Sequence, residues 1–145
     1  MDKIRVKNCK VIKLPIIQDG KDGCLSVAES FHNIPFKIKR VYYIYNINNK
    51  NAIRGMHAHK KLQQVIFCIN GSFFLRLNDG TKKQDIILDE PNIGIYIGVE
   101  LWHTMKRFSE DCILLVFASD FYDESDYIRN YSQFIKYLEH KNDFI

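Results

Sequence analysis

The sequence predicts an all-β protein, built as an antiparallel sandwich or barrel, that ends in a short C-terminal α-helix. Two observations predict the sheets: runs rich in β-branched and aromatic residues return at intervals of about ten residues, and turn-forming residues separate them. A third predicts the helix, because the apolar pattern near the C-terminus changes from strand alternation to the spacing of a helix face. No linker or repeat divides the 145 residues, so we expect a single domain spanning residues 1–145.

The strands are predicted from their composition and from the turns beside them. Residues 10–17 open the chain as a strand, and Pro15 favours an edge position because proline cannot donate to a neighbouring strand. Residues 38–47 are the run densest in β-forming side chains. Asn78, Asp79 and Gly80 are typical of a hairpin turn. Further strands are predicted at residues 24–29, 62–69, 73–77, 85–88, 93–99, 102–108 and 112–118.

The C-terminal helix is predicted at residues 132–140, where Phe134, Ile135 and Leu138 fall on one helix face. An acidic, tyrosine-rich segment precedes it at residues 120–131. The carboxylates of this segment have the composition of a metal cluster. We interpret them instead as an acidic turn before the helix, with a capping residue among them.

Composition and charge exclude several classes of protein. Hydrophobic residues make up 46% and charged residues 26% of the chain, as in ordinary soluble domains. The net charge of +4 is spread along the sequence, without the dense basic face of a nucleic-acid-binding protein. No apolar run approaches the roughly 20 residues that span a bilayer, and no secretion signal is visible. The four cysteines are scattered, and we expect a reduced, cytoplasmic setting with no membrane partner.

The stretch from Arg54 to Gly71 carries the strongest functional signal. It has the pattern of a strand, a bend and a second strand, with His57 and His59 on the first strand. Alternation along an extended segment sends both imidazoles to the same face. Their Cα atoms would lie about 6.6 Å apart, from a rise of ~3.3 Å per residue. Because the reference pKa of histidine is ~6.5, two such side chains can supply a base and an acid near neutral pH.

Several motifs in the sequence resemble those of a known family. His57, His59, Gln64 and Gly71 fit the first motif of the cupin superfamily, and residues 94–103 approximate its second motif, which ends in a histidine. A wider set of motifs closely resembles the cupin-type sugar-nucleotide 3,4-ketoisomerases, which act on dTDP-4-keto-6-deoxyglucose. These motifs lie at residues 39–45, 54–60, 71–72, 79–80, 94–96, 114–120 and 122–129.

The resemblance implies a single cupin barrel, which is jelly-roll-like, and an isomerase that needs no metal ion or other cofactor. It implies a dTDP-linked 4-keto-6-deoxyhexose as the substrate and a dTDP-3-keto-6-deoxyhexose as the product. It also implies a homodimer, since related enzymes exchange N-terminal strands between subunits. The configuration of the product at C4 and the identity of the final sugar stay open.

The reaction implied by the resemblance assigns catalytic roles. Moving a ketone from C4 to C3 needs a base at C3, an enediol and an acid at C4, so we expect His57 and His59 to share these proton transfers. The sequence leaves open which of them is the base. Tyr43 is the candidate relay hydroxyl, on a strand expected to line the same pocket. A different strand register would give that role to Tyr42 or Tyr45.

The substrate-binding candidates come from several strands. Arg54 is always charged and is expected to hold the pyrophosphate or an enolate oxygen. Lys60 is a second phosphate candidate, although alternation directs it to the face opposite His59. The remaining candidates are Gln64 for a hydrogen bond, Tyr96 and Trp102 for the walls around thymine or sugar, and His103 through the second motif. Core packing is the structural alternative for the aromatic residues, and solvation is the alternative for the lysine.

Two other functions fit the same pattern. In a metal-dependent cupin, comparable to a dioxygenase, His57, His59 and His103 would bind iron, zinc or manganese. The fourth position is then Gln64, a neutral amide where metal-binding cupins place glutamate, and this difference weakens binding of a divalent ion. A non-catalytic sugar-nucleotide sensor would keep the phosphate contacts but would need no paired histidines.

Overall fold

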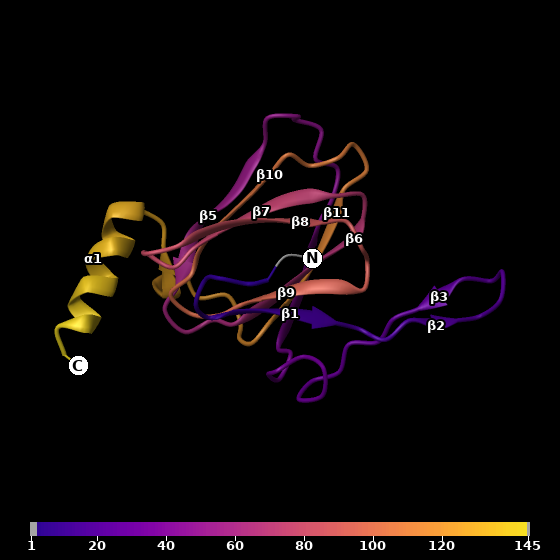
Figure 1. The fold of residues 1–145 in the computed structure, drawn as a ribbon, viewed down its shortest axis with the longest axis horizontal. Helices are drawn as coiled ribbons and strands as arrows, with labels where there is room; N and C mark the ends of the chain where they lie inside the picture. Colours follow the sequence, from indigo (N-terminus) through magenta and orange to yellow (C-terminus); the bar gives the residue numbers. More distant parts are fainter. Residues whose placement is uncertain (1–2, 145) are drawn as a thin grey trace.

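The computed structural model describes residues 3–144, in which the strands form two five-stranded antiparallel sheets and a two-stranded hairpin (Figure 1). Sheet I has the order β1 (Cys9–Lys13), β9 (Ile93–Ile97), β6 (Gln64–Asn70), β11 (Ile113–Ala118) and β4 (Arg40–Ile44). Sheet II has the order β12 (Tyr127–Ile128), β5 (Ile53–His59), β10 (Trp102–Lys106), β7 (Phe73–Asn78) and β8 (Lys83–Leu88).

The main core lies between the two sheets. Strand β8 alternates exposed and buried residues, as expected for a strand with one face on a core. Phe73 and Leu75 of sheet II and Ile66 and Leu114 of sheet I belong to one buried cluster. Each such side chain contributes about 1.5–3 kcal/mol when it leaves water. The all-β, cupin-like fold predicted from the sequence is therefore confirmed.

A second core covers the outer face of sheet I. The segment after β1 folds back across this face and buries Ile34 and Phe36 against Val65 and Phe67. Residues 64–68 are consequently buried on both sides of β6. This double burial explains why the sequence there is a continuous apolar run rather than an alternating one.

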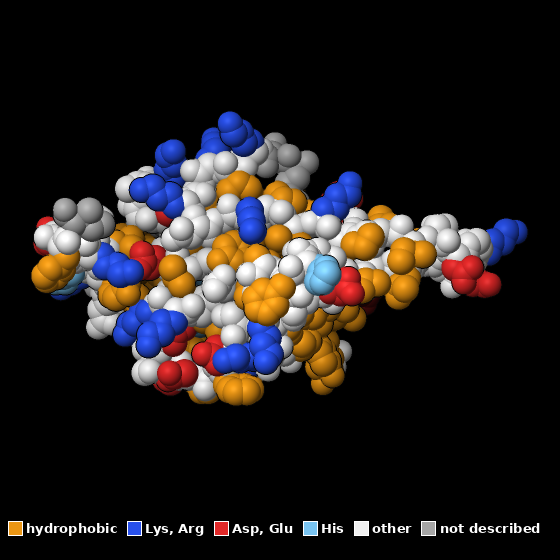
Figure 2. All heavy atoms as spheres, turned by 90° about the horizontal axis from the view of Figure 1, so that it is seen from below, with side chains coloured by type: hydrophobic (Ala, Val, Ile, Leu, Met, Phe, Trp, Pro, Cys, Tyr) orange, Lys and Arg blue, Asp and Glu red, His pale blue; other side chains and the backbone are white. Residues whose placement is uncertain are grey.

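A narrow arm projects from the barrel. In the sequence it lies between β1 and the residues that cover the outer face of sheet I. It consists of β2 (Ile17–Gln18) and β3 (Cys24–Leu25), which pair as an antiparallel hairpin. Figure 1 shows this arm leaving the barrel on the side away from α1, and Figure 2 shows hydrophobic side chains along it. Ile16, Ile17 and Leu25 are each more than half exposed. The arm therefore offers apolar surface that residues 3–144 do not cover.

The helix α1 (Tyr131–Asn142) packs against the end of sheet II. Its Phe134 is fully buried in a cluster with Trp102 and Ile128. The acidic turn before it forms a 3-10 helix, η1 (Glu124–Asp126), which Asp123 caps by accepting a hydrogen bond from the backbone of Ser125. Both the helix and the acidic turn follow the sequence prediction. None of the helices in residues 3–144 is long and apolar enough to cross a membrane.

The strand boundaries differ from the prediction at a few places. Strand β1 lies at the edge of sheet I, as Pro15 suggested, but it ends at Lys13, before the proline. Strand β4 ends at Ile44, and Asn46 shortly beyond it has a φ of 55°, which lies outside the region of regular extended strands. Strand β12 was not predicted, because two residues are too few to show a period. Its two residues form a strand because they pair with β5.

Candidate active site

A β-bulge in β5 sets the direction of the first histidine. Gly55 and Met56 both have positive φ angles, of 79° and 58°, and the register with β10 shifts between His103 and Thr104. A Cβ atom on Gly55 would lie 2.9 Å from the carbonyl oxygen of His103. Glycine is therefore required at this position by both conformation and space. The bulge leaves His57 paired directly with His103 of the neighbouring strand.

Three imidazoles and a phenol ring gather at this point. The ring centroids of His57 and His59 are 4.9 Å apart, and the two planes meet edge to face. His103 approaches His57 to 4.5 Å from the adjacent strand. Tyr127 of β12 packs against His57 at 4.9 Å and against His59 at 4.4 Å. The two histidines of β5 thus share one face, and the second motif brings its histidine to the same place.

Hydrogen bonds define which nitrogen of each ring is free. Nδ1 of His57 lies 3.0 Å from the carbonyl oxygen of Gly55, and Nδ1 of His103 lies 3.3 Å from that of Leu101. Because a carbonyl oxygen can only accept, each Nδ1 carries the proton and each Nε2 keeps its lone pair. His59 directs its Nδ1 to a carboxylate, and its buried Nε2 has no hydrogen-bond partner among the described residues.

Burial keeps all three histidines neutral. Together with a smaller contribution from the neighbouring His59, it lowers the pKa of His57 to about 4. Burial also lowers the pKa of His59, although the carboxylate beside it acts in the opposite direction. The pKa of His103 lies well below its ordinary value for the same reason. At neutral pH the site therefore contains imidazoles that can accept a proton.

A protonated hydroxyl faces the site from sheet I. Tyr42 of β4 points inward and accepts a hydrogen bond of 2.8 Å from Nε2 of Gln64. Burial, with a smaller contribution from the nearby Tyr127, raises the pKa of Tyr42 to about 12. The phenol thus keeps its proton at neutral pH. Because its oxygen already accepts from Gln64, its own O–H group is free to donate into the pocket.

Arginine side chains surround the mouth of the site. A pocket of about 450 Å³ is lined by His57, Tyr42 and Tyr127 and by three arginines, Arg40, Arg54 and Arg129. The buried Nε of Arg40 has no hydrogen-bond partner within residues 3–144. The guanidinium of Arg129 forms two hydrogen bonds with Glu124, of 2.6 and 2.9 Å. A pocket with this rim suits an anion whose other end reaches the histidines.

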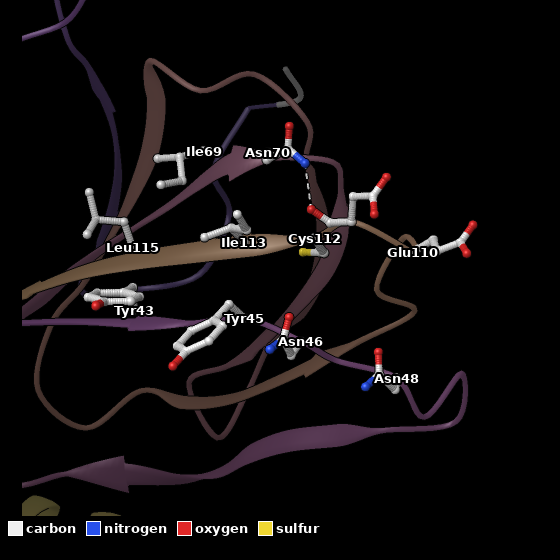
Figure 3. Close-up of a pocket in the computed structure, with 11 residues that line it drawn as sticks. Tyr43, Tyr45, Asn46, Asn48, Ile69, Asn70, Glu110, Cys112, Ile113 and Leu115 are labelled. Carbon is white, nitrogen blue, oxygen red and sulfur yellow. Dashed lines mark hydrogen bonds between the residues drawn. The ribbon is translucent and has the colours of Figure 1, made fainter.

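The structure does not place Tyr43 in this pocket, which corrects the sequence expectation. Side chains alternate along β4, so the neighbour of the inward Tyr42 points outward, and Tyr43 is 63% exposed. Figure 3 shows Tyr43 and Tyr45 on the outer side of sheet I, beside Ile113 and Leu115. The hollow there is larger, about 870 Å³, but it contains no histidine or arginine. We therefore assign the chemistry to the smaller pocket.

Three other expected binding residues also lie elsewhere. Tyr96 sits on the outer face of sheet I, where its hydroxyl donates a hydrogen bond to Oε1 of Gln63. Trp102 is 8% exposed and packs beneath α1, because it lies on the face of β10 opposite His103. Lys60 is exposed and its Nζ donates to the carbonyl oxygen of Ser125. Alternation along β9 and β10 accounts for the positions of Tyr96 and Trp102, and Lys60 lies in the bend just after β5.

Several residues that the structure brings to the site were not predicted from the sequence. Arg40 and Tyr127 lie in motifs that carried the family resemblance, but neither was given a role. Asp126 and Arg129 come from the segment interpreted as an acidic turn. A signal existed in residues 122–129, where charged and tyrosine residues cluster beside a short strand. The pairing of β12 with His59 of β5 is visible only in the folded structure.

The fold and the site together define a cupin-like barrel protein in which one histidine of a buried cluster, His57, lines an arginine-rimmed pocket. A family model described as "FdtA: WxcM-like, C-terminal" matches residues 7–139, and the chain belongs to this family.

Characterised relatives share both sequence and structure with this chain. It is 50% identical over 129 residues to the TDP-4-oxo-6-deoxy-alpha-D-glucose-3,4-oxoisomerase of Aneurinibacillus thermoaerophilus, covering 89% of this chain and 91% of that protein. The crystal structure of QdtA, a sugar 3,4-ketoisomerase from Thermoanaerobacterium thermosaccharolyticum in complex with TDP, matches with a TM-score of 0.89 and 46% identity over 97% of this chain and 100% of that chain. The WlaRB TDP-quinovose 3,4-ketoisomerase from Campylobacter jejuni matches with a TM-score of 0.85 and 48% identity, covering 90% and 99% of the two chains.

Proposed function

We propose that the protein is a sugar-nucleotide 3,4-ketoisomerase that converts dTDP-4-keto-6-deoxyglucose into a dTDP-3-keto-6-deoxyhexose. The observation that carries this proposal is the adjacent pair of neutral imidazoles, His57 and His59, beside an arginine-rimmed pocket. Relatives named as TDP-sugar 3,4-ketoisomerases support it at 46–50% identity. A histidine-to-asparagine mutant of QdtA, which is 46% identical to this chain, was solved with TDP-4-keto-6-deoxyglucose, so that relative binds this sugar nucleotide.

The reaction moves a carbonyl group between two adjacent carbons. A base removes the proton from C3, and the electron pair forms an enediolate across C3 and C4. A proton is then delivered to C4, and the C4 oxygen gains a second proton while the C3 hydroxyl loses its own, so that the product is an isomer of the substrate. His57 and His59 can serve the two adjacent carbons because their rings lie side by side. Positioned proton transfer of this kind contributes about 10²–10⁴-fold to a rate.

Tyr42 takes the relay role that the sequence analysis gave to Tyr43. Its free O–H group can donate to the oxygen on which negative charge develops in the enediolate. The hydrogen bond from Gln64 fixes the direction of that donation. Gln64 therefore acts on the substrate through the tyrosine. Tyr127, which contacts both histidines, closes the opposite wall of the pocket.

The arginines at the mouth provide the contacts for a pyrophosphate. The guanidinium of Arg40 is partly buried, and its Nε has no hydrogen-bond partner among the described residues. A buried donor of this kind is stabilised when an anion arrives. Arg54 is exposed and lines the same pocket, so the two side chains can approach one diphosphate from two strands. His103, which is fully enclosed, holds His57 in place from behind.

Metal-dependent chemistry is the second candidate, and one observation favours it. One ring nitrogen from each of His57, His59 and His103 lies within 4.8 Å of the others, which suits a divalent ion. Their Nδ1 atoms donate to protein oxygens, as metal-binding histidines usually do. The amide of Gln64, in the fourth position, supplies no negative charge. Dialysis against a chelator followed by metal analysis and assay separates the two candidates.

We also propose that the protein is a cytoplasmic homodimer. The β2–β3 arm exposes apolar residues that a second copy of the chain could bury. Val41 and Tyr43 are exposed on the outer face of sheet I and provide an apolar surface for such a contact. Strand β1 pairs with β9 of its own chain, so the arm is the segment available for exchange. The four cysteines, all within the described residues, are free, which fits a reducing compartment. Sedimentation equilibrium would return twice the chain mass, and a monomer would contradict this proposal.

The proposed activity is tested by incubating the purified protein with dTDP-4-keto-6-deoxyglucose and identifying the product by NMR. The expected result is a 3-keto sugar still attached to dTDP, formed at the same rate before and after removal of metals. Activity that appears only after iron, zinc or manganese is added would favour the metal-dependent candidate. Tight binding of the sugar nucleotide with no conversion would identify a sensor.

A further inference from the structure

Two cysteines of sheet I meet in the main core. Sγ of Cys68 on β6 lies 3.8 Å from Sγ of Cys112, the residue just before β11. The two residues are 44 positions apart in the chain, and they are 1% and 2% exposed. A disulfide bond is ~2.05 Å long, so the sulfurs need to approach by about 1.8 Å. Rotation about the Cα–Cβ bonds of the two side chains can supply a displacement of this size.

The turns next to the two cysteines are fastened to one another. The N–H of Ser72 donates to Oγ of Ser109 over 2.9 Å, and the N–H of Ser109 donates to the carbonyl oxygen of Ser72 over 2.9 Å. The side-chain amide of Asn70 donates to the carbonyl oxygen of Asp111 over 2.6 Å. These contacts join the end of β6 to the start of β11 and hold the two thiols opposite each other.

A small oxidant has a route to one of the two sulfurs. Cys112 lines the hollow of about 870 Å³ on the outer side of sheet I, near Asn46 and Glu110 (Figure 3). Tyr43, which belongs to the proposed dimer surface, lies at the other end of this hollow. Of the two cysteines, Cys112 alone is among the described residues that line it. A peroxide molecule that enters the hollow therefore meets Cys112 first.

The polar contacts of the pair favour reaction at the same thiol. The sulfur of Cys68 lies 3.2 Å from the carbonyl oxygen of Asn70, and its S–H group can turn to Sγ of Cys112 instead. Donation to Cys112 stabilises the thiolate of that residue and lowers its pKa, although burial acts in the opposite direction. The same contact raises the pKa of Cys68. Because the thiolate is the reactive form of cysteine, Cys112 is the residue that is oxidised first.

We propose that Cys68 and Cys112 are a site of reversible oxidation, at which a peroxide converts the two thiols into a disulfide between β6 and β11. The thiolate of Cys112 attacks one oxygen of hydrogen peroxide, the O–O bond breaks, and the departing hydroxide takes up the thiol proton to form water. The sulfur of Cys68 then displaces the hydroxyl group of the Cys112 sulfenic acid, which leaves with the proton of Cys68 as a second water.

The balance of this reaction is two thiols and one peroxide on one side and one disulfide and two waters on the other. The thiols lose two electrons and the peroxide gains them. A dithiol reductant reverses the change by thiol–disulfide exchange. The disulfide closes the loop between residues 68 and 112, which restricts the unfolded chain, so the oxidised protein is the more stable form. This modification is independent of the proposed isomerase reaction.

The test treats the full-length protein with hydrogen peroxide and then blocks the remaining thiols with N-ethylmaleimide. We expect mass spectrometry of the digested protein to show two peptides joined through Cys68 and Cys112, and dithiothreitol to restore both thiols. The melting temperature of the oxidised protein, measured without reductant, should rise by about 5–15 °C. Both cysteines remaining reduced at a peroxide concentration that oxidises the exposed Cys24 would overturn the proposal.

Serine variants separate the two steps. Cys68→Ser should leave Cys112 as a sulfenic acid that dimedone traps, whereas Cys112→Ser should leave Cys68 as a thiol. Cys24→Ser is the control, because it removes an exposed thiol on the arm and should form the same link as the wild type. Oxidation of Cys112 beyond the sulfenic acid without a link to Cys68 would also overturn the proposal. Peptide mapping of the wild type needs no variant, so the test holds even where a serine variant fails to fold.

Discussion

Gln64 on β6 donates a hydrogen bond of 2.8 Å to the hydroxyl of Tyr42 on β4, across the intervening strand β11. This contact shows which tyrosine of the β4 segment faces the histidines. Tyr42 is partly buried with an occupied acceptor and a free proton, while Tyr43 next to it is 63% exposed. We therefore expect the relay role to belong to Tyr42, the residue whose hydroxyl is already oriented.

Replacing each tyrosine by phenylalanine tests this assignment. Tyr42→Phe removes the donor that faces the pocket, and we expect kcat to fall by about 10²-fold, the lower end of the range for a positioned proton-transfer group. Tyr43→Phe, the matched control on the same strand, should keep kcat within about twofold. Steady-state kinetics with the 4-keto sugar nucleotide make the comparison. Loss of activity in Tyr43→Phe with a normal Tyr42→Phe would reverse the assignment.

The bulge at Gly55 is open to a similar test. Alanine at this position adopts a strained φ of 79° and brings its Cβ to within 2.9 Å of the His103 carbonyl oxygen. We expect Gly55→Ala to lower the free energy of unfolding by about 2–4 kcal/mol, from strain and displacement of β10, and to lower kcat as well.

Gly20→Ala is the control for this change. Gly20 also has a positive φ, of 51°, but nothing lies within 4 Å of an added Cβ. This variant should lose only about 1 kcal/mol and keep its activity. Urea denaturation measures both variants, and equal losses of stability would show that the contact with His103 is unimportant.

The two histidines of β5 have a direct mutational test. His57→Asn and His59→Asn each remove a proton-transfer group while keeping a polar side chain of similar reach. We expect turnover to fall by about 10²–10⁴-fold in each, with the melting temperature within a few degrees of wild type. Circular dichroism melts and progress curves give the two quantities. Variants that are inactive because they unfold would return these histidines to a structural role.

The pH dependence of kcat/KM follows from the burial of the site. Burial disfavours the imidazolium form and lowers the pKa of His57 to about 4, and the pKa of His59 is lowered as well. The base forms thus persist as the pH falls below the ordinary histidine value of ~6.5. On the alkaline side, Tyr42 keeps its proton because its pKa is raised to about 12. We expect kcat/KM to be flat from about pH 6 to about pH 9. An acid limb centred at pH 6.5 or above would contradict this account, once recovery of activity at pH 7 has excluded unfolding.

The strand that carries Tyr42 shows how far the sequence could be interpreted. Residues 38–47 are rich in β formers on both faces, so composition located a strand but gave no alternation from which to choose a face. The register came from pairing with β11, which sets Tyr42 opposite Val116 and Tyr43 opposite Leu115. The predicted strand is therefore confirmed, while Tyr43 lies outside the pocket and the alternative tyrosine, Tyr42, lines it.

The histidine strand shows the opposite case. A period of two placed His57 and His59 on one face from sequence alone, and the rings do meet at 4.9 Å. The contact of His59 with Asp126 could not be predicted, because it joins residues 67 positions apart through a two-residue strand. Local patterns predict what lies along one strand. Side chains that meet through tertiary pairing need the assembled barrel.

Solvent deuterium provides the most direct test of the central claim, that His57 and His59 transfer protons between two adjacent sugar carbons without a metal ion. Chelator-treated protein is incubated with dTDP-4-keto-6-deoxyglucose in D₂O, and the product is analysed by NMR. We expect a 3-keto product that carries deuterium at C4, and no such product from His57→Asn or His59→Asn. A product that retains only protium at C4, or one that forms only when a divalent metal is restored, would contradict it.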